Sequence, residues 1–471
     1  MTTTREPSTP QRLRGLRPML LRLHFYAGVF VGPFILIAAV TGLLYAVIPQ
    51  IDSAVHRHEL RVDQVGDQRL PLADQLSAAR AAHPEGTVEA IRPPNAPDET
   101  TQVRLAVDDV PPDYARTVFV DPYTGEVRGA LTTYGQWMPV RAWFDELHRN
   151  LHLGVVGRNY SELAASWLWV ISLAGLALWY LHRRDTRKLR RIAVPDRGKK
   201  DRRRTMSWHG AVGVWIVVAL LGLSVTGITW SRYGGETVNL VQQRLDTAAP
   251  TVDTTLLPNG GVTGGGHHHG GSAEISGGQV SLHGADTALR TALDAGLSGP
   301  IWMTPPTATG QGWEVSENKR DWPTRHDAIS VDPATGAITD RVDFAQWPFL
   351  AKLTDWAIDA HMGVLFGLPN QILLALTAIG LITIVVRGYV MWWQRRPTRG
   401  STWAVGRPPL RATVRNLHPA ALTLLIVGAV AVGWALPLFG ASLAAFVIVD
   451  LVVGAVKKRK PHVQQEETAD V

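Results

Sequence analysis

The 471-residue sequence contains no cysteine. This absence excludes disulfides, thiolate zinc sites, iron–sulfur clusters and haem attached covalently through Cys-x-x-Cys-His. Charged residues are also scarce, at 18% of the chain, whereas hydrophobic residues make up 46%. Any redox or metal centre in this protein therefore needs ligands other than thiolate, and 16 histidines are present to supply them.

Charged residues are almost absent from a few long apolar segments of the sequence. Four of them reach the roughly 20 residues needed to cross a hydrocarbon core, and a fifth, with Pro437 and Gly440 at its middle, is long enough for a pair of helices. The predicted spans are 24–48, 162–182, 208–231, 370–394 and the two-helix hairpin 418–457. A single stretch of this kind can be a buried helix of a soluble protein. The repeated pattern instead predicts an integral membrane α-helical bundle of about six transmembrane helices.

Lys and Arg residues between these spans indicate an orientation. They number five in 1–23, twelve in 183–207, six in 395–417 and four in 457–460. Because Lys and Arg gather on the cytoplasmic side of membrane proteins, we expect these segments, the tail 458–471 and both termini to lie in the cytoplasm. The protein would then be a multi-pass protein of the cytoplasmic (inner) membrane, embedded in its lipid bilayer.

The long segments 49–161 and 232–369 would lie outside, and they contain more acidic than basic residues. The net charge of +7 and the pI of about 9.7 therefore reflect membrane topology. A nucleic-acid partner is not indicated, because no basic groove interleaved with aromatic residues is present.

Four landmarks occur in the same order in both halves of the chain. They are a His followed 17 residues later by Thr-Gly (His24 and His209), Val-Asp-Pro-x-Thr-Gly (120–125 and 331–336), Gln-Trp (136–137 and 346–347), and His-x-Gly (His152 and His361). This order predicts a parallel internal repeat, in which each half supplies an outgoing helix, an external domain and a returning helix.

The external segments have the pattern of α+β domains. Apolar residues are spaced as in helices at 72–82 and 285–297, and as in strands at 102–107, 115–120, 312–317 and 327–331. The Asp-Pro-x-Thr-Gly segments are typical of hairpin turns. A glycine-rich insertion at 258–278 contains His267, His268 and His269, which could hold a metal weakly, although a solvated linker is the favoured interpretation.

The repeated histidines are the candidate cofactor ligands. His24 and His209 start the outgoing helices, whereas His152 and His361 precede the returning helices. A twofold axis would bring each like pair together, and facing imidazoles between helices are typical of bis-histidine b-type haem. We therefore predict two haem b groups. His148 stands one helical turn before His152, so either could be the outer ligand. A lone histidine at a helix end is more often interfacial, and only the pairing favours ligation.

These motifs together resemble the PepSY-associated transmembrane family, sometimes described as iron-regulated membrane proteins, over about residues 18–396. The carrying segments are the two His-to-Thr-Gly helices, the paired Val-Asp-Pro-x-Thr-Gly turns, Leu-His-Arg-Asn-Leu-His-Leu-Gly at 147–154, and His-Met-Gly with Gly-Leu-Pro-Asn-Gln at 361–363 and 367–371. The resemblance implies PepSY-like external domains. It favours His148 as the outer ligand, whereas the internal repeat favours His152. The hairpin 418–457 lies outside the pattern.

The best-understood branch of that family consists of inner-membrane ferric-siderophore reductases with two b haems. The resemblance thus implies an oxidoreductase that passes electrons outward to a ferric siderophore or another Fe(III) chelate. The cytoplasmic segments have no nucleotide or flavin motif, so the donor would be a cytoplasmic partner or a membrane quinol. A non-redox sensor or regulator that binds peptide or protease is the second hypothesis. A permease is third, because the first four spans lack broken helices and midplane charges. The sequence does not fix the oligomeric state.

Overall fold

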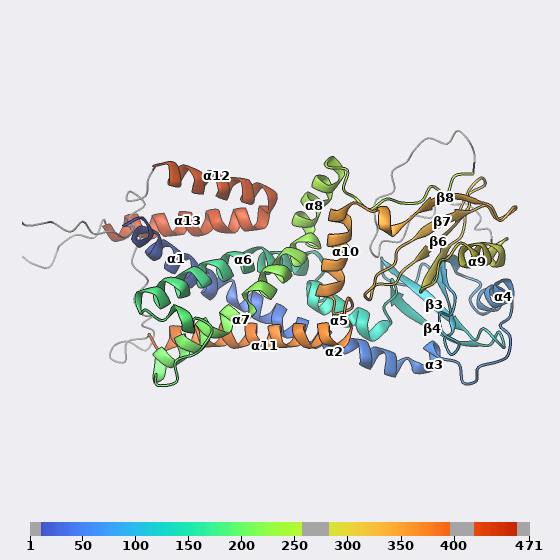
Figure 1. The fold of residues 1–471 in the computed structure, drawn as a ribbon, viewed down its shortest axis with the longest axis horizontal. Helices are drawn as coiled ribbons and strands as arrows, with labels where there is room; N and C mark the ends of the chain where they lie inside the picture. Colours follow the sequence, from blue (N-terminus) through green and yellow to red (C-terminus); the bar gives the residue numbers. More distant parts are fainter. Residues whose placement is uncertain (1–10, 257–281, 396–418, 459–471) are drawn as a thin grey trace, which may run out of the picture. The chain divides into compact units, whose positions relative to one another are not determined.

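The computed structural model describes residues 11–256, 282–395 and 419–458 (Figure 1). These residues form two compact units. The helical unit comprises the described parts of Met1–Val40, Asn150–Val241 and Thr377–Val471, and the sheet unit those of Thr41–Arg149 and Gln242–Leu376. The candidate tract His267–His269 lies outside the described residues, as does most of the basic segment 395–417.

Helices long and apolar enough to cross a membrane number five among the described residues. They are α2 (Gly32–Val55), α6 (Gly154–Asp185), α7 (Asp201–Thr229), α11 (Leu368–Trp393) and residues Pro437–Val456 of α13 (Pro437–Lys458). Between α11 and α13 lies α12 (Pro419–Ala435), a shorter apolar helix of 17 residues. The protein is therefore a multi-pass membrane protein, and a sixth span at α12 stays a prediction.

The structure divides the predicted first span, 24–48, between two helices. The long apolar helix is Gly32–Val55 rather than 24–48, and α1 (Gln11–Phe30) precedes it. The backbone nitrogens of Val31 and Ile35 still donate to the carbonyls four residues earlier, at 2.8 and 3.1 Å. The chain therefore keeps helical hydrogen bonds through the junction, and α1 carries the residues before it, His24 among them, along one rod.

Polar contacts inside the helical unit join its helices. Arg22 of α1 forms an ion pair with Asp450 of α13, and the indole nitrogen of Trp167 donates to Ser442 Oγ at 2.8 Å. Both contacts tie the α12–α13 hairpin to the helices that the sequence pattern covers. Bonded polar groups of this kind are needed within a hydrocarbon environment, where water is not available as a partner. The remaining helix of this unit is α8 (Arg232–Arg244), which follows α7.

The sheet unit contains one antiparallel sheet of eight strands in the order β4-β3-β2-β1-β5-β6-β7-β8. The strands are β1 (Thr87–Arg92), β2 (Thr101–Ala106), β3 (Tyr114–Val120), β4 (Val127–Tyr134), β5 (Ile301–Thr304), β6 (Trp313–Glu317), β7 (Ala328–Val331) and β8 (Ile338–Val342). The sequence pattern suggests one domain per external segment. The two segments instead share this sheet, because β1 pairs with β5 at Ile91 and Met303.

Two helices, α4 (Leu72–Ala82) and α9 (Ala285–Asp294), cover one face of the sheet (Figure 1). Their small apolar residues pack on strand residues to form the core, which includes Leu76, Ala79, Ile91, Val103, Ala288, Ala292, Met303 and Trp313. Asp286 of α9 also accepts the backbone N–H groups of Leu72 and Ala73, at 2.6 and 3.1 Å. This carboxylate satisfies free donors at the start of α4, as a helix cap does.

The repeated Asp-Pro-x-Thr-Gly segments form the predicted hairpin turns. Asp121 Oδ1 accepts the Tyr123 N–H at 2.8 Å, and Asp332 Oδ1 accepts the Ala334 N–H at 2.9 Å. Gly125 and Gly336 have φ of 75° and 72°, the left-handed region that glycine adopts readily. Both aspartates thus have a structural task in the β3–β4 and β7–β8 turns. The short helices α3 (Arg57–Leu60), α5 (Pro139–Asn150) and α10 (Phe349–His361), with the single turn η2 (Phe344–Gln346), complete the unit.

Candidate functional site

His24 of α1 and His209 of α7 face one another in the helical unit. Their ring centroids lie 6.1 Å apart and the ring planes are inclined by 83°. Two imidazoles bound to one metal ion at about 2.0 Å place their ring centres about 6 Å apart, because each centre lies about 1.1 Å behind its nitrogen. The separation of the two rings therefore matches that of a pair of axial ligands.

Hydrogen bonds orient both rings. His24 Nδ1 lies 3.0 Å from the carbonyl oxygen of Ile171 in α6, and His209 Nδ1 lies 2.8 Å from that of Ile384 in α11. A carbonyl oxygen can only accept, so Nδ1 is the protonated nitrogen of each neutral ring and Nε2 keeps the lone pair. Backbone partners of this kind fix the tautomer and orientation of histidine ligands.

A glycine lies beside each ring, and at Gly175 the close approach of the ring requires the absence of a side chain. Gly175 stands four residues after Ile171, and a Cβ there would lie 2.8 Å from His24 Cε1. Gly388 stands four residues after Ile384, and a Cβ there would lie 3.9 Å from His209 Cε1. Each imidazole therefore rests against a helix at a point without a side chain, one turn from the carbonyl to which it donates.

A cavity of about 340 Å³ adjoins the two histidines and is lined by residues of α1, α6, α7 and α11. Gly28 and Gly213, each four residues after a histidine, line it, and a Cβ at either would meet nothing within 4 Å. The helix face next to each imidazole is thus open. A largely apolar cavity of this size is within the range of ligand pockets.

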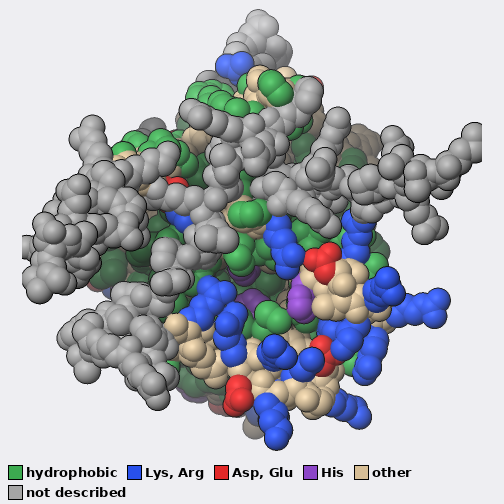
Figure 2. Space-filling view, turned by 90° about the vertical axis from the view of Figure 1, so that its left-hand side faces the viewer, with side chains coloured by type: hydrophobic (Ala, Val, Ile, Leu, Met, Phe, Trp, Pro, Cys, Tyr) green, Lys and Arg blue, Asp and Glu red, His purple; other side chains and the backbone are tan. Residues whose placement is uncertain are grey.

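Basic side chains lie at one end of this cavity. Arg17, Arg202 and Arg395 line it, and Arg17 also donates to Asp185 at 3.0 Å. Burial and the nearby positive charge of Arg202 lower the pKa of Arg395. Two neighbouring guanidinium groups of this kind favour an anion between them. Figure 2 looks onto this end of the helical unit, where Lys and Arg side chains surround a hollow in which histidine side chains are visible.

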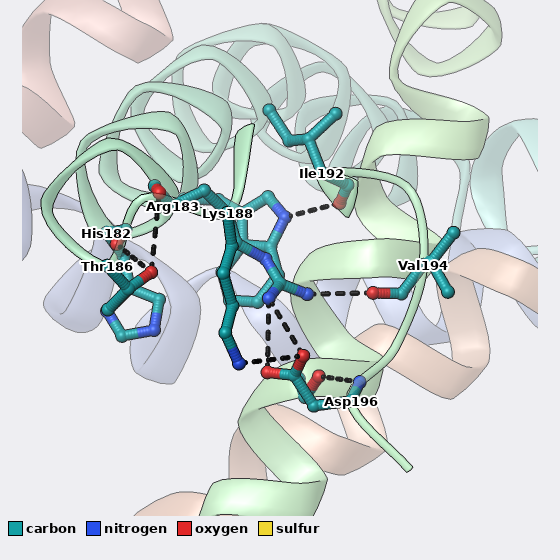
Figure 3. Close-up of polar contacts among 9 residues, drawn as sticks. His182, Arg183, Thr186, Lys188, Ile192, Val194 and Asp196 are labelled. Atoms are coloured by element: carbon teal, nitrogen blue, oxygen red, sulfur yellow. Dashed lines mark hydrogen bonds and ion pairs between the residues drawn. The ribbon is translucent and has the colours of Figure 1, made fainter. Parts of the chain in front are cut away.

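Hydrogen bonds and an ion pair hold the segment that follows α6 (Figure 3). Arg183, fully buried, donates to Asp196 at 3.1 Å and to the Val194 carbonyl at 2.8 Å. The Trp179 indole donates to the Ile192 carbonyl at 2.8 Å and packs where a Cβ of Gly210 would otherwise stand. This network holds the basic connection between α6 and α7 in place. His182, in the last turn of α6, stacks on Trp179 and lines the cavity.

A second histidine pair lies in the sheet unit. The ring centroids of His148 in α5 and His361 in α10 are 6.4 Å apart. Thr41 Oγ1 lies 2.9 Å from His148 Nδ1, and a Cβ at Gly42 would lie 3.0 Å from His148 Cε1. Burial, with a smaller contribution from His148, lowers the pKa of His361 to about 3. The His361 ring is therefore neutral at physiological pH and can offer a lone pair.

The structure separates the two candidates for the outer position. It brings His148, not His152, beside His361, and His152 is exposed with φ of 55° just after α5 has ended. An offset of 213 residues relates His148 to His361, as it relates Ile171 to Ile384. The same offset does not relate His152 to His361, which the His-x-Gly pattern pairs.

A third group of candidate ligands, which lies in the sheet unit, was not predicted. His326, Asp355 and Asp359 each offer one ligand atom, and these atoms lie within 4.8 Å of one another. Burial raises the pKa of Asp359 to about 6, against the opposing effect of the Arg320 charge. Asp355 and Asp359 are one turn apart on α10, and this i, i+4 spacing was the available signal in the sequence.

These features define a multi-pass membrane protein with an α+β sheet unit and paired histidines. The model of the PepSY-associated TM region matches residues 21–395, so the chain belongs to this family. A comparison with curated proteins finds no similar sequence.

Proposed function

We propose that this protein is a transmembrane haem b protein of the cytoplasmic membrane, which reduces a ferric siderophore or another Fe(III) chelate on the outer face. The observation that carries the proposal is the His24–His209 pair. Its rings are separated as axial ligands are, its Nδ1 atoms are tied to carbonyls, and it borders an apolar cavity. Haem, when bound, supplies one-electron chemistry that no side chain of this chain provides.

The residues present fit such a group. His24 and His209 would be its axial ligands, Gly28 and Gly213 would leave room for the ring, and Arg202 with Arg395 would pair with its carboxylates. His148 and His361 would hold a second haem. The family membership and the absence of cysteine support non-covalent, histidine-held haem over other redox groups.

The two halves of the chain are proposed to be copies of one unit. The helices carrying His24 and His209 correspond with an offset of 185 residues, shared by Gly28 and Gly213. The returning helices correspond with an offset of 213 residues, shared by Gly175 and Gly388. A duplication explains why the hydrogen bond and the glycine beside each ring occur twice, and it supports a pair of similar cofactor sites.

The test is a haem measurement on the full-length protein. Expressed in haem-replete cells and solubilised, it should show a b-type reduced-minus-oxidised spectrum and about two haem equivalents per chain by the pyridine assay. His209→Ala and His361→Ala should each remove about one equivalent. A protein without a b-type spectrum contradicts the proposal. If haem is bound, ferrozine capture of Fe(II) from ferric chelates then tests the substrate class.

A further inference from the structure

We propose that His326, Asp355 and Asp359 form a binding site for a divalent first-row transition metal ion, separate from both histidine pairs. The site lies within the sheet unit. Asp355 and Asp359 project from the last turns of α10, and His326 stands two residues before β7. Residues distant in sequence thus place one imidazole nitrogen and two carboxylate oxygens within 4.8 Å of one another.

The three ligand atoms have no hydrogen-bond partner among the described residues. They are His326 Nε2, Asp355 Oδ2 and Asp359 Oδ2, and each is buried. His326 Nε2 and Asp355 Oδ2 are 3.1 Å apart, an ion-pair distance without hydrogen-bond alignment. Leaving a buried polar atom unsatisfied destabilises the folded state, and more so when the atom is charged. An ion at the centre of the cluster would satisfy all three atoms at once.

Neighbouring side chains hold the ligands in place. Arg320 Nε donates to Asp359 Oδ1 at 2.7 Å, which leaves Oδ2 as the oxygen directed into the cluster. The His326 ring is stacked on Trp347, with centroids 5.6 Å apart, and meets the edge of Phe344 at 5.1 Å. Partners that orient metal ligands in this way are a regular feature of metal sites.

Burial and charge also suit a cation. Asp359 is 0% exposed, and the His326 and Asp355 side chains are only 12% and 14% exposed. Two carboxylates beside one guanidinium leave one negative charge when the imidazole is neutral. The site can therefore accept a dication and leave a coordination position for water or another ligand.

The donor set indicates the class of ion. Ca²⁺ and Mg²⁺ prefer sites made of oxygen ligands, whereas an imidazole with carboxylates suits Mn²⁺, Fe²⁺, Co²⁺ or Zn²⁺. Metal binding at this site requires neither haem nor electron transfer. It can therefore be tested independently of the proposed function.

Zn²⁺ and Mn²⁺ are the probes. The full-length protein, purified in detergent without an oligohistidine tag, is stripped with a chelator and dialysed against each ion, and bound metal is counted by mass spectrometry. The parent and every variant contain His267→Ala, His268→Ala and His269→Ala, so that the histidine tract does not contribute to metal binding. We expect about one Zn²⁺ per chain, and a melting temperature that rises with Zn²⁺ as binding to the folded state requires.

Asp355→Asn and His326→Gln should each abolish both effects, while exposed Asp294→Asn in α9 serves as the matched control and should retain them. Circular dichroism shows whether each variant is folded, and the second variant keeps the test valid if the first does not fold. The proposal is overturned if the parent binds no Zn²⁺ or Mn²⁺, or if folded Asp355→Asn and His326→Gln bind as much as the parent.

Discussion

Gly28 is placed where any larger side chain would enter the cavity beside His24 and His209. A Cβ there meets nothing within 4 Å, so Gly28→Leu should be accommodated by the helix, but its branches would occupy the cavity in which we propose that haem binds. We expect the variant to fold and to lose about one haem equivalent in the pyridine assay.

Gly222→Leu is the matched control, because a Cβ at Gly222 also meets nothing within 4 Å and the residue does not line the cavity. It should keep both haem equivalents. If Gly28→Leu also binds two haems with unchanged spectra, haem does not occupy this cavity. That result would hold whether or not the histidines are haem ligands.

Glu314 of β6 gives a prediction about pH. Burial is the only cause that raises the pKa of this carboxyl group, so the folded state holds its proton more tightly than the unfolded state. Stability from this group is present at low pH and is lost as pH rises from the unfolded towards the folded pKa. Glu314→Gln should therefore raise the melting temperature of the sheet unit at pH 7.5, and raise it less at pH 4.

Circular dichroism melts at the two pH values make the measurement, with exposed Glu126→Gln in the β3–β4 turn as the control that should change little at either pH. A variant that is less stable than the parent at pH 7.5 would show that the Glu314 carboxylate has a favourable partner when charged.

At the scale of elements, the periodicity of apolar residues predicts the position of helices and strands, because local interactions determine where these elements form. The helix at 72–82 has its predicted bounds, and the strands at 102–107 and 312–317 lie within one residue of β2 and β6. Their apolar periodicity alone sets which face is buried. The junction between β1 and β5 was not predictable in this way, because it joins residues more than 200 positions apart through one pair, Ile91 and Met303.

The candidate site shows the same difference between features that local sequence predicts and features that depend on long-range contacts. The sequence singled out His24, His209 and His361 as candidates from their repeated pattern, and the structure places His24 beside His209 and His361 beside His148. The sequence left His148 and His152 open, because the choice depends on where α5 ends, and α5 ends at Asn150. The cluster at His326 was missed, since nothing local joins that residue to α10.

The end of α5 gives a prediction of its own. His148 lies within the helix, next to His361, whereas His152 is exposed beyond it. We expect His148→Ala to lose about one haem equivalent and His152→Ala to lose none, because His148 is the imidazole that lies beside His361. If only His152→Ala loses haem, then His152, as the His-x-Gly repeat suggests, is the outer ligand, and His148 is not.

At the scale of the whole molecule, charge asymmetry is the basis of orientation. Basic residues crowd the connection between α6 and α7, while the chain segments of the sheet unit are net acidic. Because the positive-inside tendency is counted over short loops near the spans, the connection of 183–207 should dominate. We therefore predict that the sheet unit faces outward and this connection faces the cytoplasm.

The absence of cysteine allows a direct test, since a single introduced cysteine is the only thiol in the protein. Asp294→Cys, exposed in α9, should react with a membrane-impermeant maleimide in intact spheroplasts. Arg197→Cys, exposed between α6 and α7, should react only after permeabilisation. Both sites are exposed, so access across the membrane, rather than burial, decides labelling. The reverse pattern would invert the topology and place the His24–His209 end outside, which would contradict a cytoplasmic electron donor for that pair.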